Sequence, residues 1–512
     1  LHTVANLQSG ESILVLGGSG GVGHGVVQFA DHAGAQVITC TSNKEKAKQL
    51  RRLGANHVID YTDTEFDDEV REITGGRGVD VVFDSVGGDI YPRAIKSLDR
   101  GGRLVTIGAT TGDADSAMLQ HIFWKQLQVR GATGCTLGEF QDALDLLFEG
   151  AVEPVVDDVI SLGVGEPDFS APWAARDAAI DSLERGRTSY TSNRGLLELR
   201  QAISGHVEDR YDLGYDADEE ILVTTGVSEA VDATLRALVD PGDTVAVVEP
   251  AYISYVPGVI FAGGEPLRVP TREADEFKLT YEALESAGAA DADLLMLCYP
   301  NNPTGAVMTG EELEPVAEFC REHDIGVLSD EIYAELQYEN EHTSIATLPG
   351  MRERTVVFNG FSKAYAMTGL RLGYAMAPPE VTTAINRVHQ YGMLSAPTTA
   401  QYAALEALRS CDDEVEAMVD EYDRRRRFVL SRFDEMGVDC FRARGAFYVF
   451  PEVPTDESAE AFAEGLLREE GVAMVPGDAF GDGGEGHLRV SYATGLDDLR
   501  EAMARFEAYI SD

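Results

Sequence analysis

Lys363 is the residue of this chain best suited to covalent chemistry. It ends the run Gly-Phe-Ser-Lys at positions 360–363, and Arg371 follows eight residues later. Beyond position 151 the chain contains one other lysine, Lys278, which follows the acidic segment 273–276. A lysine amine whose pKa is lowered by burial and by a nearby cation is uncharged near neutral pH and can attack a carbonyl carbon. We therefore expect a nucleophilic amine at Lys363, and we expect Lys278 to lie in a solvated loop.

Three further motifs place polar groups in loops of the same half of the chain. Residues 225–228, Thr-Gly-Val-Ser, can open a helix and bind a phosphate through backbone N–H groups, although the same pattern is a common helix N-cap. Residues 299–305, Tyr-Pro-Asn-Asn-Pro-Thr-Gly, could be an ordinary Pro/Gly turn. Asp330 and Tyr333 place a carboxylate three residues before a phenol, where Asp330 could instead cap a helix. Each motif alone is a weak signal, but together they form a connected set.

Two arginine motifs have a simpler explanation at the surface. Arg489 lies in the alternating segment 487–492, where a solvated strand arginine is the usual interpretation. Four consecutive arginines at 424–427 follow Glu421 and Asp423 in a segment with helical character. We interpret this run as a solvated, salt-bridged helix face rather than as an anion site.

Buried strands precede the polar loops of this half. The pattern predicts strands at residues 220–224, 244–248, 294–298, 326–329 and 355–359, with helical segments between them. Such alternation indicates an α/β fold with a largely parallel sheet. Sheets of this kind bind ligands in the loops that follow their strands, so the fold itself can collect the motifs at one edge.

The first half of the chain alternates in the same way, with strands predicted at residues 13–17, 36–41, 57–61, 79–86 and 103–108. The first strand runs into a glycine-rich turn and then into a helix, which is the context that a dinucleotide fingerprint requires. The residues expected to carry the pyrophosphate are Gly18, Gly20, Gly21, Val22 and Gly23. The alternative is a glycine-rich turn with a structural role only.

The loop after the second predicted strand favours NADP over NAD. Residues 41–44 are Thr-Ser-Asn-Lys, without the acidic residue that binds a ribose 2′-hydroxyl. The hydroxyl of Ser42 and the ammonium of Lys44 suit a 2′-phosphate instead. A solvated helix start is an equally good explanation for Lys44, because Glu45 and Lys46 follow it.

Composition limits the classes of partner and compartment. The chain has 512 residues, 44% of them hydrophobic, and a formal net charge of −47. This charge argues against nucleic acid and anionic membranes as partners, and acidic residues spread along the whole chain are typical of a protein from a high-salt cytoplasm. Six cysteines without a CxxC pair or a His/Cys cluster predict a reducing, cytoplasmic location and no metal site. No signal peptide opens the chain and no apolar run reaches the length of a membrane span.

Residues 1–158 resemble the nucleotide-binding domain of the medium-chain dehydrogenase/reductase family, in its quinone oxidoreductase branch. The resemblance is carried by the glycine turn 17–23, by Leu-Gly-Ala at 53–55, by Val-Phe-Asp-Ser-Val-Gly-Gly at 82–88 and by Gly-Gly-Arg-Leu at 101–104. In that family a separate catalytic domain precedes this one and shapes the substrate cleft. We therefore expect a truncated Rossmann-type, doubly wound parallel sheet that at most binds NADP(H).

The motifs of the second half, taken in order, resemble the class I/II aminotransferases, which are fold type I pyridoxal-phosphate (PLP) enzymes. The resemblance implies an α/β large domain at residues 159–420, whose first residues belong to the small domain, and a small α+β domain at 421–512. It further implies that Lys363 forms a Schiff base with PLP and that Asp330 pairs with the pyridine nitrogen. The remaining cofactor contacts implied are Gly226, Val227, Ser228, Tyr252, Asn302, Tyr333, Ser362 and Arg371.

The same resemblance implies the substrate contacts and a homodimer. Gly165, Asn302 and Arg489 would bind the substrate, with Arg489 gripping its carboxylate through two parallel hydrogen bonds. Tyr190 would reach across a subunit interface to the cofactor of the partner. The predicted reaction moves an amino group between an L-amino acid and a 2-oxo acid, and Lys363, Asp330 and Tyr333 are its catalytic residues.

Two alternatives stay open at the level of sequence. The second half could be a PLP-dependent lyase or decarboxylase acting on an amino acid. The first half could make the protein an NADP-linked oxidoreductase or a nucleotide-binding module. The identities of the amino acid and of the 2-oxo acid do not follow from the residues.

Overall fold

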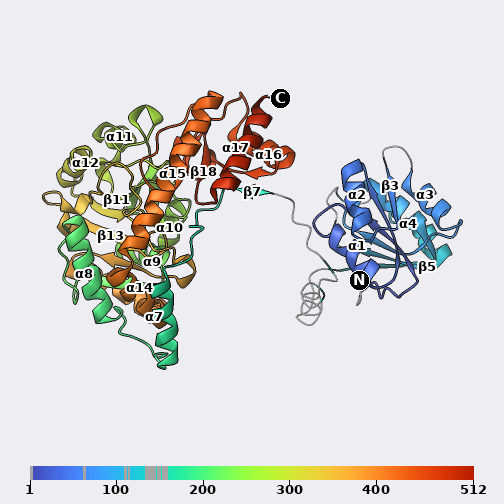
Figure 1. Cartoon of the computed structure of the whole chain (residues 1–512), viewed down its shortest axis with the longest axis horizontal. Helices are drawn as coiled ribbons and strands as arrows, with labels where there is room; N and C mark the ends of the chain where they lie inside the picture. The colour runs from blue at the N-terminus through green and yellow to red at the C-terminus, as the bar shows by residue number, and fades with distance from the viewer. Residues whose placement is uncertain are drawn as a thin grey trace. The chain divides into compact units, whose positions relative to one another are not determined.

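Two sheets of buried strands organise the chain, each within its own unit. The computed structural model describes residues 4–61, 65–108, 112, 116–132, 146, 152 and 159–511. The chain divides into two units, residues 1–157 and 158–512, which are drawn in Figure 1 from blue to cyan and from green to red. The predicted join of the two halves lies largely outside the described residues. The predicted boundary between residues 420 and 421 stays a prediction.

The first unit contains a parallel sheet with the strand order β3-β2-β1-β4-β5-β6. The strands are β1 (Ser12–Leu16), β2 (Gln36–Thr41), β3 (His57–Asp60), β4 (Val79–Asp84), β5 (Leu98–Thr106) and β6 (Gln128–Gly131). All five strands predicted from the sequence are present. The order reverses beside β1, as a doubly wound sheet requires, and this confirms the expected fold class.

Helices cover both faces of this sheet. They are α1 (Gly23–His32), α2 (Lys44–Arg52), α3 (Phe66–Ile73), α4 (Tyr91–Ser97) and α5 (Leu119–Lys125). Because side chains alternate along a strand, Ile13 and Val15 of β1 pack with Val27 of α1, whereas Leu14 and Leu16 pack in a second core with α3 and α4. The first core also contains Leu50 of α2.

The second unit contains a seven-stranded sheet with the order β10-β9-β11-β12-β13-β14-β8. Its strands are β8 (Ile221–Thr224), β9 (Thr244–Glu249), β10 (Glu265–Pro270), β11 (Leu294–Cys298), β12 (Gly326–Asp330), β13 (Thr355–Gly360) and β14 (Gly373–Met376). The five predicted strands are again present. Strand β14 runs antiparallel to both of its neighbours, so its first residue lies at the edge where the parallel strands end.

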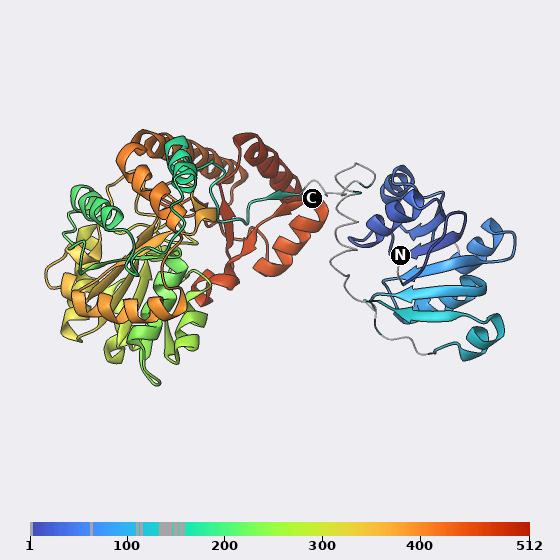
Figure 2. The same ribbon diagram turned by 90° about the horizontal axis from the view of Figure 1, so that it is seen from below.

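The helices of this unit surround the sheet, except the last two in the chain, which pack against short strands of the C-terminal region (Figures 1 and 2). The helices are α7 (Trp173–Glu184), α8 (Leu197–Tyr211), α9 (Val227–Leu238), α10 (Tyr255–Ala262), α11 (Tyr281–Ala287), α12 (Gly310–Glu322), α13 (Pro379–Gly392), α14 (Thr398–Ser410), α15 (Asp412–Met436), α16 (Ala459–Glu470) and α17 (Leu496–Ser511). Successive residues of a strand point to opposite faces of the sheet and therefore enter different cores. Val245 and Val247 of β9 belong to one, and Ala246 and Val248 belong to another.

Short strands of the C-terminal region form two small sheets. One has the order β15 (Tyr448–Val449), β18 (Leu488–Ser491) and β17 (Val475–Pro476). The other pairs β16 (Val472–Ala473) with β7 (Ile160–Ser161), so the start of this unit is bound to its C-terminal part. None of the helices in the described ranges combines the length and apolar character needed to cross a bilayer.

The arginine run on α15 differs from its sequence interpretation. All four arginines form ion pairs, as predicted, but Arg425 and Arg426 are buried rather than solvated. Arg425 pairs with Glu421 and with Asp168, a partner 257 residues away in the sequence. The solvated interpretation is therefore wrong for these two residues, because acidic partners from other segments compensate their burial.

Candidate active site

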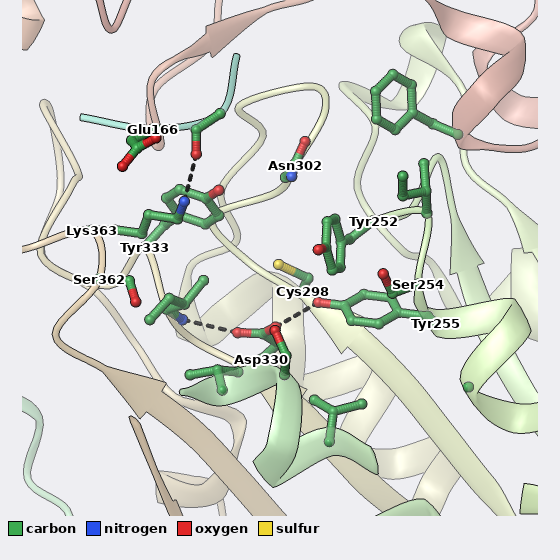
Figure 3. Close-up of a pocket in the computed structure, with 18 of the residues that line it drawn as sticks. Glu166, Tyr252, Ser254, Tyr255, Cys298, Asn302, Asp330, Tyr333, Ser362 and Lys363 are labelled. Atoms are coloured by element: carbon green, nitrogen blue, oxygen red, sulfur yellow. Dashed lines mark hydrogen bonds between the residues drawn. The ribbon is translucent and has the colours of Figure 1, made fainter. Parts of the chain in front are cut away.

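The carboxyl ends of the central strands converge on one cavity of about 940 Å³. Asn302 follows β11, Asp330 ends β12, and Ser362 and Lys363 follow β13. Arg371 precedes β14, and the antiparallel direction of this strand brings the residue to the same edge. The topology thus assembles side chains that are far apart in the sequence, as Figure 3 shows.

Lys363 projects into this cavity with its amine largely removed from water (Figure 3). Its Nζ donates a hydrogen bond to the carbonyl oxygen of Gly165 at 2.5 Å. Burial lowers the pKa of the amine to about 8, Glu166 opposes this shift through its charge, and Arg489 adds to it. A substantial fraction of the amine is therefore uncharged near neutral pH, as nucleophilic attack requires.

Lys278, by contrast, is ion-paired. It contacts the carboxylates of Glu276 and Glu312, and its side chain is 16% exposed, so the prediction of a solvated loop is wrong. Its pKa is raised: burial opposes the charged form, but the hydrogen bonds to Glu276 and Glu312 outweigh it. This lysine is held as a cation and is unsuited to nucleophilic attack.

Asp330 lies buried on the cavity floor at the end of β12 (Figure 3). One carboxylate oxygen accepts a hydrogen bond from the phenol of Tyr255 at 2.6 Å, and the other accepts one from the N–H of Ile332 at 3.1 Å. Burial raises the pKa of Asp330 to about 6, while these hydrogen bonds act in the opposite direction. The group is a buried carboxylate that can receive a proton near neutral pH.

Arg489 provides a buried cation at another wall of the cavity. Its guanidinium donates to the side-chain oxygen of Asn302 at 3.0 Å and to the carbonyl of Gly163 at 2.6 Å. The rings of Tyr448 and Phe480 lie 4.7 and 4.9 Å from its central carbon. Its Nε is buried and has no hydrogen-bond partner within the described structure. The usual interpretation as a solvated strand arginine is wrong, and the orphan donor suits a carboxylate ligand.

The opposite end of the cavity has the character of an anion site. Helix α9 begins at Val227, and its first N–H groups have no intrahelical acceptors. Gly226 precedes it with φ +78°, and a Cβ atom there would lie 2.7 Å from Nη2 of Arg371. The guanidinium, the helix N-terminus and the hydroxyl of Ser228 therefore meet at one place, where a phosphate group fits.

Most residues expected from the sequence line this cavity. They are Gly165, Val227, Ser228, Tyr252, Asn302, Asp330, Tyr333, Ser362, Lys363, Arg371 and Arg489. Gly226 is not among the lining residues, but its Cα lies against the guanidinium of Arg371. Tyr190 is not among the lining residues, and 80% of its side chain is exposed. The roles assigned to all of these residues remain predictions.

Among the lining residues that the sequence interpretation did not name, several make side-chain hydrogen bonds at the site. Tyr255 binds Asp330, Tyr448 shares a 3.0 Å hydrogen bond with the hydroxyl of Tyr333, and Glu166 accepts a hydrogen bond from Thr368. Tyr252 lies three residues before Tyr255, the first residue of α10, and this spacing at the start of a helix was a usable signal. No local pattern marks Tyr448.

The glycine turn of the first unit has the predicted strand–turn–helix context between β1 and α1. A Cβ atom at Gly18 would lie 1.9 Å from Thr39 Oγ1, and one at Gly23 would lie 1.9 Å from the Gly17 carbonyl oxygen. These two glycines are thus required by packing. Nothing lies within 4 Å of a Cβ at Gly21, and Val22 is exposed, as are Ser42 and Lys44 in the loop after β2.

Comparisons with known proteins match the two units to different families. Residues 157–506 match the family model Aminotransferase class I and II, and residues 21–149 match Zinc-binding dehydrogenase. A putative aminotransferase, YugH, of Bacillus subtilis is 49% identical over 356 residues, which are 69% of this chain and 92% of that protein. An aspartate aminotransferase of Pyrococcus abyssi is 42% identical and covers 72% and 98%. The crystal structure of an aromatic aminotransferase from Pyrococcus horikoshii superposes with a TM-score of 0.68 at 44% identity, over 70% and 97%.

Proposed function

Because the chain belongs to the class I and II aminotransferase family, we propose that the cavity around Lys363 binds pyridoxal phosphate and is the site of amino-group transfer. The chain is an aminotransferase, an enzyme that moves an amino group between an amino acid and a 2-oxo acid. The match of relatives named as aminotransferases disfavours the lyase and decarboxylase alternatives. One observation carries the proposal: a buried amine with a lowered pKa and a buried carboxylate line the same cavity.

The residues of the cavity fit pyridoxal phosphate at both of its ends. Its phosphate would meet Arg371, Ser228 and the N-terminus of α9, where the first N–H groups of a helix lack intrahelical acceptors. Its ring would lie near Tyr252, with Asn302 and Tyr333 toward the ring oxygen. When bound, the cofactor supplies an aldehyde that combines with amines and a ring that accepts the electron pair released at Cα.

The side chains would divide the work of binding and proton transfer. Arg489 would bind the substrate α-carboxylate with its Nη atoms and the unpartnered Nε, which fixes the direction of the Cα–H bond. The uncharged amine of Lys363 would then take the proton from Cα and deliver it to the carbon that the cofactor aldehyde contributes, on the other side of the amino nitrogen. The carboxylate of Asp330 would keep a proton on the ring nitrogen, a task for which burial has removed competing water.

The test is to replace Lys363 with alanine. The wild type, purified in high salt with pyridoxal phosphate, should show the absorbance of the covalently bound cofactor and should transaminate. Lys363→Ala should lose both signals, because no other amine reaches the cavity among the described residues. Lys278→Ala, the matched control, should retain them. Covalent cofactor in Lys363→Ala would refute the assignment.

We also propose that the enzyme is a homodimer in which Tyr190 completes the site of the partner. Monomers rarely leave many large apolar side chains in water. This unit exposes several, which are Trp173, Leu183, Tyr190, Ile253, Ile260, Phe261, Tyr391 and Met393. Ile253 and Phe261 also line the cavity, so the exposed apolar surface borders the site. A single monomer mass in light scattering would exclude this arrangement.

A second candidate function belongs to the first unit, and we propose that it binds NADP(H). The glycine turn between β1 and α1 is packed as a dinucleotide site requires, and the exposed Ser42 and Lys44 suit a 2′-phosphate. NADPH fluorescence should increase on binding and NADH fluorescence should not.

The five described cysteines are free, which supports a reducing, cytoplasmic location.

A further inference from the structure

We propose that this enzyme prefers amino acids with an apolar or aromatic side chain to dicarboxylic amino acids, because the described residues that line its cavity offer a cation for one substrate carboxylate only. The inference rests on the proposed function of the cavity and adds the class of substrate. The relatives alone do not give it, since they include proteins named for aspartate and for aromatic amino acids.

The argument begins with the cations of the cavity. Among the described residues that line it, three are basic, namely Lys363, Arg371 and Arg489. Lys363 is the proposed cofactor ligand. Arg371 lies against Gly226 at the phosphate end, where its Nη2 is 2.7 Å from the place of a Cβ atom. Arg489 therefore remains as the one cation for a substrate anion, and the α-carboxylate uses it.

The wall beside Arg489 is apolar. Val475 of β17 is the register partner of Arg489 in β18, and side chains of paired residues in antiparallel strands point to the same face. The ring of Phe480 lies 4.9 Å from the guanidinium, and Ala479 continues this wall. A substrate whose carboxylate meets Arg489 thus places its side chain against hydrocarbon rather than against a second cation.

A charged group of the cavity lining would repel a second carboxylate. Glu166 lines the cavity next to Gly165, whose carbonyl accepts the hydrogen bond from Lys363. Its carboxylate is the strongest charge acting on the Lys363 amine. A dicarboxylic substrate would lose the hydration of its distal group and would gain a like charge instead.

The two arginines that flank Tyr190 in the sequence already make contacts within this chain. Arg187 stacks on the ring of Tyr402 at 4.5 Å, and Arg194 donates to the carbonyls of Asp218 and Glu219.

The first test titrates the PLP-loaded wild-type enzyme in high salt with two unreactive acids. The absorbance of the bound cofactor is followed with 3-phenylpropanoate and with succinate. The apolar acid should bind about 10-fold more tightly or better, and L-phenylalanine should exceed L-aspartate by a similar factor in kcat/KM. Equal or tighter binding of succinate would overturn the inference. Failure of the protein to take up PLP would instead refute the proposed function.

The second test adds the missing charge. Val475→Lys should place an ammonium on the same face as Arg489 and raise the binding of succinate relative to 3-phenylpropanoate by about 10-fold. Val475→Met, a matched uncharged control, should leave this ratio in favour of the apolar acid. An unchanged ratio in the lysine variant would contradict the assigned wall. If Val475→Lys does not fold, Ile253→Arg with Ile253→Met as its control decides, because 55% of Ile253 is exposed.

Discussion

At the scale of residues, burial moves the pKa values of the two central titratable groups toward neutral pH, one downward and one upward. The pKa of Lys363 falls to about 8 and that of Asp330 rises to about 6, in each case mainly because the surrounding protein disfavours the charged form. Between these values both groups can exchange a proton at little cost. A site that moves protons at carbon needs such groups, whereas a structural ion pair would be held fully charged.

The lowered pKa of Lys363 predicts how the cofactor-free enzyme captures pyridoxal phosphate. The uncharged amine reacts and the ammonium does not, so the capture rate should rise with pH and level off above a midpoint near 8. An ordinary lysine would give a midpoint above pH 10. Stopped-flow absorbance between pH 6 and 10 measures this profile. A rate that still climbs steeply at pH 10 would show that burial does not lower the pKa as described.

Tyr255 should control the acidic limb of catalysis. Its phenol stabilises the charged form of Asp330 by a 2.6 Å hydrogen bond, so Tyr255→Phe should raise the pKa of this carboxyl. Asp330 would then be protonated at higher pH, and the acidic limb of kcat/KM should move upward by about one pH unit. Tyr281→Phe, which removes a phenol bound to the distant Glu322, should leave the limb in place. If the acidic limb of kcat/KM does not move in Tyr255→Phe, protonation of Asp330 is not the cause of that limb.

Sequence reasoning found Lys363 and, through the family resemblance, Arg489, but it missed Tyr255 and the burial of Arg489. Lys363 stood out because lysine is almost absent from the second half of the chain. Tyr255 matters through a carboxylate 75 residues away, and Arg489 is buried because Asn302 and Gly163 accept its N–H groups. The sheet brings these partners together across long distances in the sequence, so the local pattern around each residue does not identify its partner.

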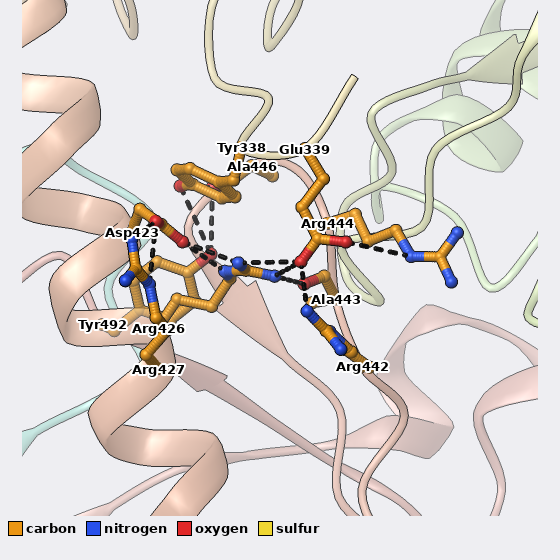
Figure 4. A network of polar contacts seen from close by, with 10 residues as sticks. All are labelled: Tyr338, Glu339, Asp423, Arg426, Arg427, Arg442, Ala443, Arg444, Ala446 and Tyr492. Atoms are coloured by element: carbon orange, nitrogen blue, oxygen red, sulfur yellow. Dashed lines mark hydrogen bonds and ion pairs between the residues drawn. The ribbon is translucent and has the colours of Figure 1, made fainter.

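At the scale of elements, the strands were predictable and the exposure of one helix face was not. Continuous apolar runs identify buried parallel strands because both faces of the sheet are covered. The arginine run of α15 gave the opposite result. Its charges predicted a solvated face, yet Arg426 is 2% exposed. The burial is possible because Glu339 and the carbonyl of Ala443, which belong to other segments, accept hydrogen bonds from its guanidinium (Figure 4).

This network predicts a large difference between neighbouring arginines. Arg426 and Arg427 both pair with Asp423, but only Arg426 also holds Glu339 and the Ala443 carbonyl, whereas 72% of the Arg427 side chain is exposed (Figure 4). Arg426→Ala removes the guanidinium bound to the buried Ala443 carbonyl and one of the cations that Asp423 and Glu339 share, and it should lower the free energy of unfolding by about 3 kcal/mol. Urea denaturation followed by tryptophan fluorescence and circular dichroism measures the loss.

Arg427→Ala is the matched control, since it removes the same side chain one position further along the helix. Its pair with Asp423 is exposed to water, so its denaturation midpoint should stay close to that of the wild type. Equal losses in the two variants would mean that the contacts of Arg426 to Glu339 and Ala443 contribute nothing to stability.

At the scale of the whole molecule, the excess of negative charge sets the conditions in which the fold is stable. Acidic residues number 88 against 41 basic ones, and many of the basic ones are already paired with nearby carboxylates. The remaining acidic groups repel one another in the folded state. The composition alone revealed this property, because net charge does not depend on how the chain folds.

The thermal midpoints of the protein should therefore rise with ionic strength. Between about 0.1 and 1 M salt the screening length falls from about 10 to 3 Å, which suppresses repulsion between surface carboxylates more than it weakens the buried ion pairs. A gain of about 2 kcal/mol would raise a midpoint by about 5 °C. Scanning calorimetry in KCl and in NaCl of equal ionic strength should give the same shift, since screening does not depend on which monovalent cation is present. A midpoint that falls with salt would show that attraction between opposite charges, rather than repulsion among the acidic ones, dominates the stability of this molecule.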